Sequence, residues 1–262
     1  MLARLQGNVS GQSYIGYMSQ TSGNKFVAAV AIIAAPFAMG AFLLAWAPSG
    51  QYQLTDPQND GYVQPRDVGG VVANTRRSTV SVFCDIPGKE GIGSAWATQL
   101  EEVEYKDYKQ VFITNYHVIE DCIGKDQYLT VARAYKKKIA AEIITIDKEN
   151  DLAVLISDLR VPSLKIAQAP PYAGYWVMTS GSADGYEGSV TFGTILNSSD
   201  DELFFTANVS HGNSGGPLVD NEGNVVGTVS WFNKTEQYNG AKSIDVMCSV
   251  ILKCDGKFYW EW

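Results

Sequence analysis

The sequence predicts an all-β domain that follows a single membrane-spanning helix, and three observations support this. One is an uncharged apolar run over residues 26–47. Another is that, from residue 71 onward, short runs of strand-forming residues alternate with turn-forming ones about every 10 residues, a pattern typical of barrels and sandwiches. Helical patterns are brief and occur only just after residue 117 and near residues 243–253.

The apolar run is long enough to cross a bilayer. It contains 22 residues without a charge, and a helix of that length extends roughly 33 Å, against a hydrocarbon core of about 30 Å. Pro36 and Gly40 would weaken a soluble helix but are tolerated in a membrane. We therefore expect residues 26–47 to be a transmembrane anchor and residues 1–25 to be a separate N-terminal segment.

Flanking charges predict the orientation of this anchor. The charged residues before it, Arg4 and Lys25, are basic, whereas acidic residues predominate just after it. The positive-inside rule then predicts a single-pass membrane protein with a cytoplasmic N-terminus and an extracytoplasmic main domain. A cleaved signal peptide is the alternative, because residues 45–47 have a small-x-small pattern, although the long leader and Pro48 disfavour it. Both interpretations place residues 48–262 on the same side.

Residues 48–71 are rich in Pro, Gly, Asn and Asp, which predicts a flexible linker. The folded domain is expected over residues 72–255, with a tail over 256–262. Its most evident strand patterns cover residues 79–83, 110–114, 142–146, 152–156, 175–178, 190–192, 203–205 and 224–229.

The charge of the chain argues against nucleic acid as a partner. The formal net charge is −8, which would repel a phosphate backbone. We interpret the one basic run, residues 136–138, as a solvated loop or strand end.

Three residues have the types and surroundings needed for nucleophilic catalysis. His117 lies where an apolar strand ends, Asp151 begins the apolar run DLAVLI, and Ser214 lies among glycines in HGNSGGPL. Glycines leave the serine hydroxyl open and free backbone N–H groups to face an oxyanion. A serine, a histidine and an acid supply a nucleophile, its base and the group that orients the base.

Other assignments of these motifs are less consistent with the sequence. Residues 212–216 also fit the G-x-S-x-G pattern of α/β-hydrolases, but that fold needs a histidine after the serine and none follows. Asp147 is a rival acid, yet no apolar strand follows it directly. His211, the other histidine, is interpreted as an exposed loop residue.

The segments TNYHVIE, NDLAVL and GNSGGPL, in this order, resemble the trypsin-like (chymotrypsin-fold) serine proteases. Among these, the chain is most similar to the bacterial trypsin-like/HtrA-like branch. The resemblance covers roughly residues 72–255. It implies two six-stranded antiparallel β-barrels, over roughly residues 72–160 and 161–245, with the active site between them.

The same resemblance implies roles for individual residues. His117 is expected to be the general base, Asp151 its orienting acid and Ser214 the nucleophile. The backbone N–H groups of Gly212 and Ser214 would form the oxyanion hole. Ser230 would bind the substrate backbone and support Asp151, as part of a substrate-binding strand with Trp231 and Phe232.

Two departures from the secreted digestive enzymes have consequences for regulation. Asn213 occupies the position of an aspartate that pairs with a freed N-terminus, so activation by N-terminal processing is not expected. Since the sequence ends about 48 residues after Ser214, we expect the PDZ domain of many HtrA-like enzymes to be absent.

The residues expected at the specificity pocket also differ from those of the digestive enzymes. Phe232 replaces a common glycine at its mouth, and Asn208 replaces its charge-determining residue. We expect cleavage after small or medium apolar residues such as alanine or valine.

The four cysteines suggest disulfides in an extracytoplasmic domain. The resemblance implies a Cys84–Cys122 bridge beside the histidine, which leaves Cys248–Cys254 as the second pair. Zinc is the alternative, but no C-x-x-C motif or histidine pair supports a metal site.

The sequence thus predicts an anchored serine endopeptidase that hydrolyses proteins or peptides outside the cytoplasm, without a cofactor. A non-catalytic binding module on the same fold and an esterase that uses the same triad are the alternatives.

Overall fold

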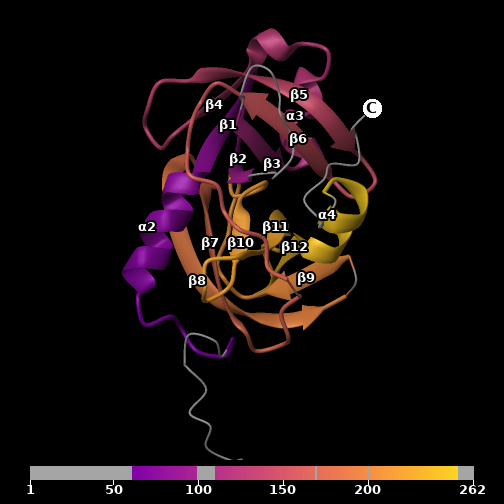
Figure 1. Ribbon diagram of the computed structural model, residues 1–262. Helices are drawn as coiled ribbons and strands as arrows, with labels where there is room; N and C mark the ends of the chain where they lie inside the picture. Colours follow the sequence, from indigo (N-terminus) through magenta and orange to yellow (C-terminus); the bar gives the residue numbers. More distant parts are fainter. Residues whose placement is uncertain (1–60, 99–109, 169, 200, 253–262) are drawn as a thin grey trace, which may run out of the picture. The chain divides into compact units, whose positions relative to one another are not determined.

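The computed structural model describes residues 61–98, 110–168, 170–199 and 201–252. These residues form two closed six-stranded antiparallel β-barrels, one after the other in the sequence (Figure 1). The all-β, two-barrel fold expected from the sequence is therefore confirmed.

The first barrel is built from the first six strands, closed in the order β1-β2-β3-β6-β5-β4. These strands are β1 Thr79–Ile86, β2 Lys89–Thr98, β3 Gln110–Thr114, β4 Leu129–Ala132, β5 Ile139–Asp147 and β6 Leu152–Ser157. Between β3 and β4 lie the short helices α3 Tyr116–Ile119, η1 Glu120–Cys122 and η2 Asp126–Tyr128. Side chains alternate along a strand, so Val80, Val82 and Cys84 of β1 all enter the barrel interior.

The second barrel closes in the order β10-β11-β12-β9-β8-β7. Its strands are β7 Trp176–Ala183, β8 Tyr186–Ser198, β9 Glu202–Phe205, β10 Pro217–Val219, β11 Val225–Phe232 and β12 Asn239–Ser243. Helix α4 Ile244–Val250 follows the last strand, and the Ser243 hydroxyl caps it by accepting from the N–H of Val246.

Three apolar clusters hold the fold together. One fills each barrel, and a third joins the barrels to each other and to α4. Trp96 of β2 lies in this third cluster, fully buried, and its indole N–H donates to Thr228 Oγ1 of β11 at 3.0 Å. The barrels are thus packed as one unit across a buried interface, which fixes the position of any site between them.

A helix absent from the sequence prediction precedes β1. Helix α2 Val68–Ser78 begins within the predicted linker, and Asp67 Oδ1 caps it by accepting from the Gly70 N–H at 2.7 Å. Residues just before the helix are also bound to the second barrel, because Gly61 O accepts from Trp176 N–H and Val63 O from Asn221 Nδ2. The linker predicted over residues 48–71 therefore needs correction: within the described residues, its end belongs to the folded domain.

Cys84 of β1 and Cys122 of η1 form a disulfide, the first of the two expected pairs. It fastens the segment after His117 to the barrel wall. Cys254 lies outside the described residues, so its pairing with Cys248 stays a prediction.

The predicted anchor over residues 26–47 also lies outside the described residues. Within the described ranges, no helix is long and apolar enough to cross a membrane.

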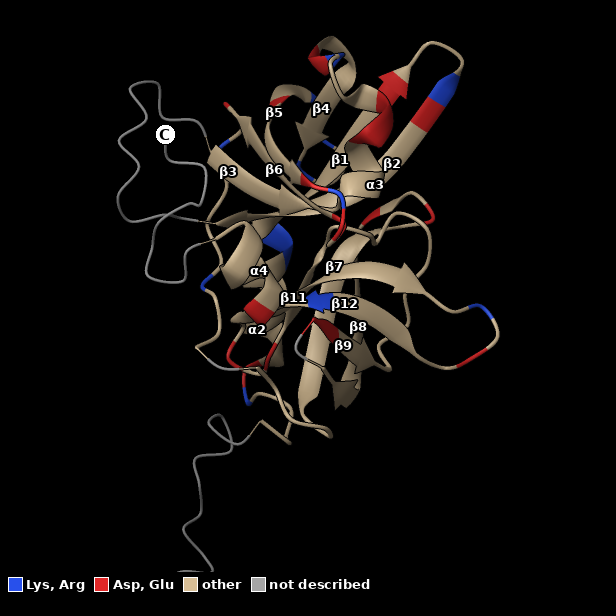
Figure 2. Cartoon of the chain, turned by 90° about the vertical axis from the view of Figure 1, so that its right-hand side faces the viewer, with Lys and Arg blue, Asp and Glu red and all other residues tan. Residues whose placement is uncertain are grey.

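On the side of the molecule opposite α2, basic and acidic segments are interspersed (Figure 2).

Candidate active site

Two neighbouring strands of the first barrel bring His117 and Asp151 together. His117 lies on α3, just after β3, and Asp151 lies just before β6. Because β3 and β6 pair antiparallel, with Thr114 opposite Ala153, the end of one strand adjoins the start of the other. Residues 34 positions apart in the sequence therefore share one site.

The Asp151 carboxylate binds His117 through two groups. His117 Nδ1 lies 2.8 Å from Oδ2 and 3.0 Å from Oδ1, and the His117 backbone N–H donates to Oδ1 at 3.0 Å. The aspartate side chain is 23% exposed and the imidazole 44%. With the Nδ1 proton directed at the carboxylate, Nε2 keeps its lone pair and can accept a proton.

A buried asparagine, not expected from the sequence, holds the backbone of Asp151. Asn115 is fully buried and donates from Nδ2 to the Asp151 carbonyl at 2.8 Å. Asp151 itself has φ +54°, a left-handed conformation that aspartate adopts more readily than most residues. The amide of Asn115 thus helps to keep the strand entry in a conformation that points the carboxylate at His117.

Ser230 binds the same carboxylate from the second barrel. A bulge in β11 between Val229 and Trp231 turns Ser230 out of the ladder, and its Oγ donates to Asp151 Oδ2 at 2.5 Å. Burial alone would raise the pKa of Asp151. The hydrogen bonds from the His117 ring, the Ser230 hydroxyl and the His117 N–H outweigh burial and lower that pKa below its ordinary value. Asp151 is therefore a carboxylate at neutral pH.

Ser214 joins this network through Ser230. Its Oγ donates to the Ser230 carbonyl at 3.2 Å. Among the described residues, no hydrogen bond joins Ser214 Oγ to His117. The serine hydroxyl would have to rotate away from Ser230 to meet the imidazole, and such bonds are often loose in the absence of substrate.

The turn before Ser214 leaves two backbone N–H groups available. The His211 carbonyl accepts from Asp184 N–H at 2.6 Å, and since a trans peptide is planar, the Gly212 N–H points the opposite way. Within the described part of the chain, neither Gly212 N–H nor Ser214 N–H donates to a protein acceptor. Gly212 has φ +91°, and a Cβ there would collide with the Ser182 carbonyl oxygen. These are the two donors that the sequence predicts for an oxyanion hole.

Asn213 stabilises this turn from inside. It is buried, its Oδ1 accepts from Ser210 N–H at 3.1 Å, and its own N–H donates to Ser210 O at the same distance. Contacts within residues 210–213 thus help to order the turn, with no aspartate at position 213.

Ser94 of β2 links this turn to the first barrel, a role that the sequence analysis did not assign. Its Oγ donates to Gly212 O at 2.6 Å and accepts from Ser182 N–H at 3.0 Å. Its backbone N–H donates to Ser214 O at 2.8 Å. Ser94 is fully buried, so water cannot replace its hydroxyl, and we identify it as a positioning residue for the turn.

Replacing Ser94 by alanine should lower kcat about 10- to 100-fold with little change in KM. Gly212 O would keep only the longer bond from Ser182 N–H, at 3.3 Å, so the Gly212–Asn213 peptide that separates the two oxyanion donors would be held less firmly. A single such donor is worth about 10²–10³ in rate in other proteases. Steady-state kinetics on a peptide substrate measure this effect.

A matched control for Ser94 is Ser81→Ala. Ser81 is a buried hydroxyl of the neighbouring strand that bonds Ser182 Oγ and Glu187 but does not touch the turn. We expect its kcat to stay near that of the unmodified protein. An equal fall in both variants would contradict the positioning role of Ser94.

A cavity of about 700 Å³ is lined by Asn208 and Phe232, the two residues expected at the specificity pocket, but by none of the three predicted triad residues. The Phe232 ring meets the His211 ring edge-on, with centroids 4.9 Å apart. Trp231 points elsewhere: its indole covers Gly240, where a Cβ would collide with the ring. That this cavity is the specificity pocket stays a prediction, and Trp231 is not among its lining residues.

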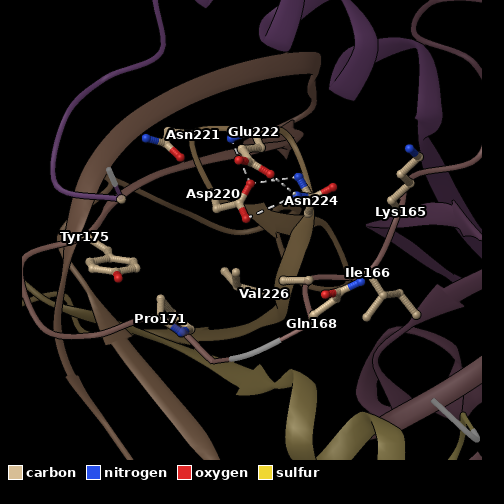
Figure 3. Close-up of a pocket in the computed structure, with 12 residues that line it drawn as sticks. Lys165, Ile166, Gln168, Pro171, Tyr175, Asp220, Asn221, Glu222, Asn224 and Val226 are labelled. Atoms are coloured by element: carbon tan, nitrogen blue, oxygen red, sulfur yellow. Dashed lines mark hydrogen bonds between the residues drawn. The ribbon is translucent and has the colours of Figure 1, made fainter. Parts of the chain in front are cut away.

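Another cavity, of about 460 Å³, contains none of the predicted site residues (Figure 3). Burial raises the pKa of Asp220, which lines it, although hydrogen bonds from Asn224 and Glu222 oppose this. Those bonds hold the turn before β11. Across the described residues, no group of three His, Cys, Asp or Glu side chains is placed to hold a metal ion.

Two β-barrels with a histidine–aspartate pair on one and a serine and glycine turn on the other define the class of trypsin-like peptidases. The family model of the trypsin-like peptidase domain matches residues 100–227, a range that includes His117, Asp151 and Ser214. Over these residues the chain is similar to this family.

Relatives agree with this assignment. The chain is 34% identical over 166 residues to a "Probable periplasmic serine endoprotease DegP-like" of Pseudomonas savastanoi pv. phaseolicola, and the match covers 57% of this chain and 34% of that protein. The chain thus spans about a third of the length of the curated relatives it matches. These relatives place it near the HtrA-like branch.

Solved structures share the fold. A serine endoprotease from Yersinia pestis matches with 25% identity and a TM-score of 0.61, over 72% of this chain and 66% of that one. The active form of the Rv3671c protease from M. tuberculosis matches with 23% identity and a TM-score of 0.59, over 71% and 86% respectively.

Proposed function

We propose that the chain is a membrane-anchored serine endopeptidase that cleaves extracytoplasmic proteins or peptides. His117 acts as general base, Asp151 orients it and Ser214 is the nucleophile. Residues 26–47 hold the enzyme in the membrane, with the peptidase domain on the extracytoplasmic side. The observation that supports this most directly is the chain of hydrogen bonds from His117 through Asp151 and Ser230 to Ser214, beside the two available N–H groups.

The reaction follows from this arrangement. His117 Nε2 accepts the Ser214 hydroxyl proton as Oγ attacks the substrate carbonyl carbon, and the N–H groups of Gly212 and Ser214 stabilise the oxyanion. The protonated imidazole, stabilised by Asp151, then gives its proton to the leaving amine. Water, deprotonated in the same way, releases the acyl group from Ser214.

Labelling with a fluorophosphonate probe tests whether the serine is activated, because only a nucleophilic serine reacts quickly. We expect rapid labelling of the full chain at Ser214 and none in Ser214→Ala. Absence of labelling would favour a non-catalytic binding module. Labelling together with ester turnover but no peptide turnover would favour an esterase.

Replacing Phe232 by glycine should widen the range of residues accepted before the scissile bond. The Phe232 ring, which meets His211 edge-on, is expected to narrow the pocket entrance, so the unmodified enzyme should prefer alanine or valine. Asn208 offers no carboxylate for a buried lysine or arginine. For substrates with phenylalanine or leucine before the scissile bond, the glycine variant should gain roughly 10- to 100-fold in kcat/KM. Differences of one or a few methylene groups in a hydrophobic pocket have effects of this size.

A peptide library that varies this residue measures the change. Phe192→Gly is a matched control, since Phe192 is a half-exposed aromatic of β8 that contacts Trp176 and does not line the pocket. Dominant cleavage after lysine or arginine by the unmodified enzyme, or the same profile in Phe232→Gly, would contradict the assignment.

The anchor predicts that the full chain stays with membranes after an alkaline carbonate wash. Ile33→Arg together with Leu44→Arg should release it, because each arginine costs up to about 2.5–3.5 kcal/mol within a membrane helix. Mass spectrometry of the mature N-terminus distinguishes the alternative: a protein that begins near Pro48 would have had a signal peptide.

A further inference from the structure

A second pocket, of about 580 Å³, lies between α2 and the connection from β4 to β5. We call it the basic pocket, because four of its lining residues are the cations Arg76, Arg77, Arg133 and Lys136 and none is acidic. This concentration of positive charge is unexpected in a chain whose net charge is −8.

The four cations have no anionic partner within the described part of the chain. Among the described residues, the ion pairs involve Lys89, His117, Lys138 and Lys242, and none of the four. The Arg77 guanidinium donates to Asn74 Oδ1 and that of Arg133 to the Arg160 carbonyl. Both acceptors are neutral, so they orient the guanidinium groups without compensating their charge.

The nearby hairpin brings the two sides of the pocket together. Glu187 of β8 accepts from Tyr135 N–H at 3.0 Å and from Ser81 Oγ at 2.8 Å through the same oxygen. At the next residue, a Cβ on Gly188 would lie 3.2 Å from both Arg76 Nη2 and Ala134 Cβ. Arg76 and the β4–β5 connection therefore both lie against β8. Glu187 holds the connection there and forms no ion pair with a cation of the described residues.

Helix electrostatics explain only part of this arrangement. Arg76 and Arg77 occupy the last turn of α2, where basic residues favourably oppose the negative end of the helix dipole. Arg133 and Lys136 lie on a different segment, so the dipole gives no reason for their presence beside this helix end. All four side chains are exposed, so water and salt screen part of their mutual repulsion, and an anionic ligand would reduce it further.

We propose that the basic pocket binds a phosphate-bearing anion, independently of the peptidase site. A phosphate monoester offers close to two negative charges and three acceptor oxygens at neutral pH. The planar guanidinium groups match such oxygens in pairs. The volume exceeds what one phosphate fills, so a small organic group such as glycerol can accompany it. A lipid headgroup and a free phosphorylated metabolite share this chemistry.

Calorimetric titration of the full chain in neutral detergent with glycerol 3-phosphate tests the site. The double variant Arg76→Gln with Lys136→Gln should bind at least tenfold more weakly. The control Lys125→Gln with Lys165→Gln removes the same charge outside the pocket and should bind as the unmodified protein does. Equal losses in both, or no binding by the unmodified protein, would overturn the proposal. The proposal would also be wrong if poly-glutamate bound saturably and glycerol 3-phosphate did not bind.

Hydrogen–deuterium exchange in lipid nanodiscs separates the two sources of phosphate. If a lipid headgroup is the ligand, exchange at residues 73–77 and 133–136 should slow in phosphatidylglycerol discs relative to phosphatidylcholine discs. If a free metabolite is the ligand, exchange should slow only when glycerol 3-phosphate is added to phosphatidylcholine discs. Unchanged exchange in all discs would refute the site even if the double variant proved unstable.

Discussion

Alanine at Ser214 or at His117 should lower kcat by about 10⁴–10⁶, with KM little affected. The two residues act as a unit, because the serine is a poor nucleophile until the imidazole takes its proton. Removing either side chain therefore abolishes most of the rate acceleration that the pair provides. The double variant should therefore be about as slow as either single one. Burst and steady-state kinetics on a peptide substrate, with active sites titrated, measure these rates.

His211→Ala is the matched control for His117. His211 is exposed and contacts Phe232, so its loss should alter substrate preference and leave turnover of an alanine or valine substrate within about tenfold of the unmodified enzyme. If His117→Ala or Ser214→Ala kept more than about a tenth of the activity, the triad assignment would be wrong.

The barrel strands could be predicted because their chemistry is local. Alternating or continuous apolar runs and turn residues mark each strand in the sequence, and they fall within β1, β3, β5 and β6 as the structure has them. Helix α2 could not be predicted in the same way. Two glycines at its start and several valines lower its intrinsic helix propensity, and packing against the barrels together with the Asp67 cap outweighs that tendency.

The predicted site residues were found from motifs, but the residues that position them were not. Ser94 meets Gly212 across 118 positions of sequence, and Asn115 meets Asp151 across 36. Such contacts depend on how two barrels dock and which strands pair, and no local pattern encodes either. The serine in GIGSAWAT and the asparagine before Tyr116 were visible, yet only their full burial shows that each must have a hydrogen-bonding partner.

Asp151→Asn should lower turnover by about 10⁴ while leaving substrate binding and the backbone unchanged. An asparagine amide placed at the carboxylate position would donate to His117 Nδ1, which then keeps its lone pair, and the proton would move to Nε2. The imidazole would present a donor where a base is needed. Single-turnover kinetics report the rate, and nitrogen NMR of the His117 ring reports the tautomer.

Asp147→Asn is the control for this substitution, since Asp147 is the rival acid and its carboxylate binds Asn150 instead. Its turnover should stay near that of the unmodified enzyme.

The pH dependence of stability gives a second test of Asp151. A pKa lowered by folding adds stability above the ordinary carboxyl pKa of about 3.9, and this stability is lost as the pH falls through the lowered folded-state pKa. In urea unfolding, the stability of the unmodified protein relative to Asp151→Asn should therefore be greatest near neutral pH and diminish in acid. A constant difference across this range, or a large loss of turnover in Asp147→Asn, would contradict Asp151 as the orienting carboxylate.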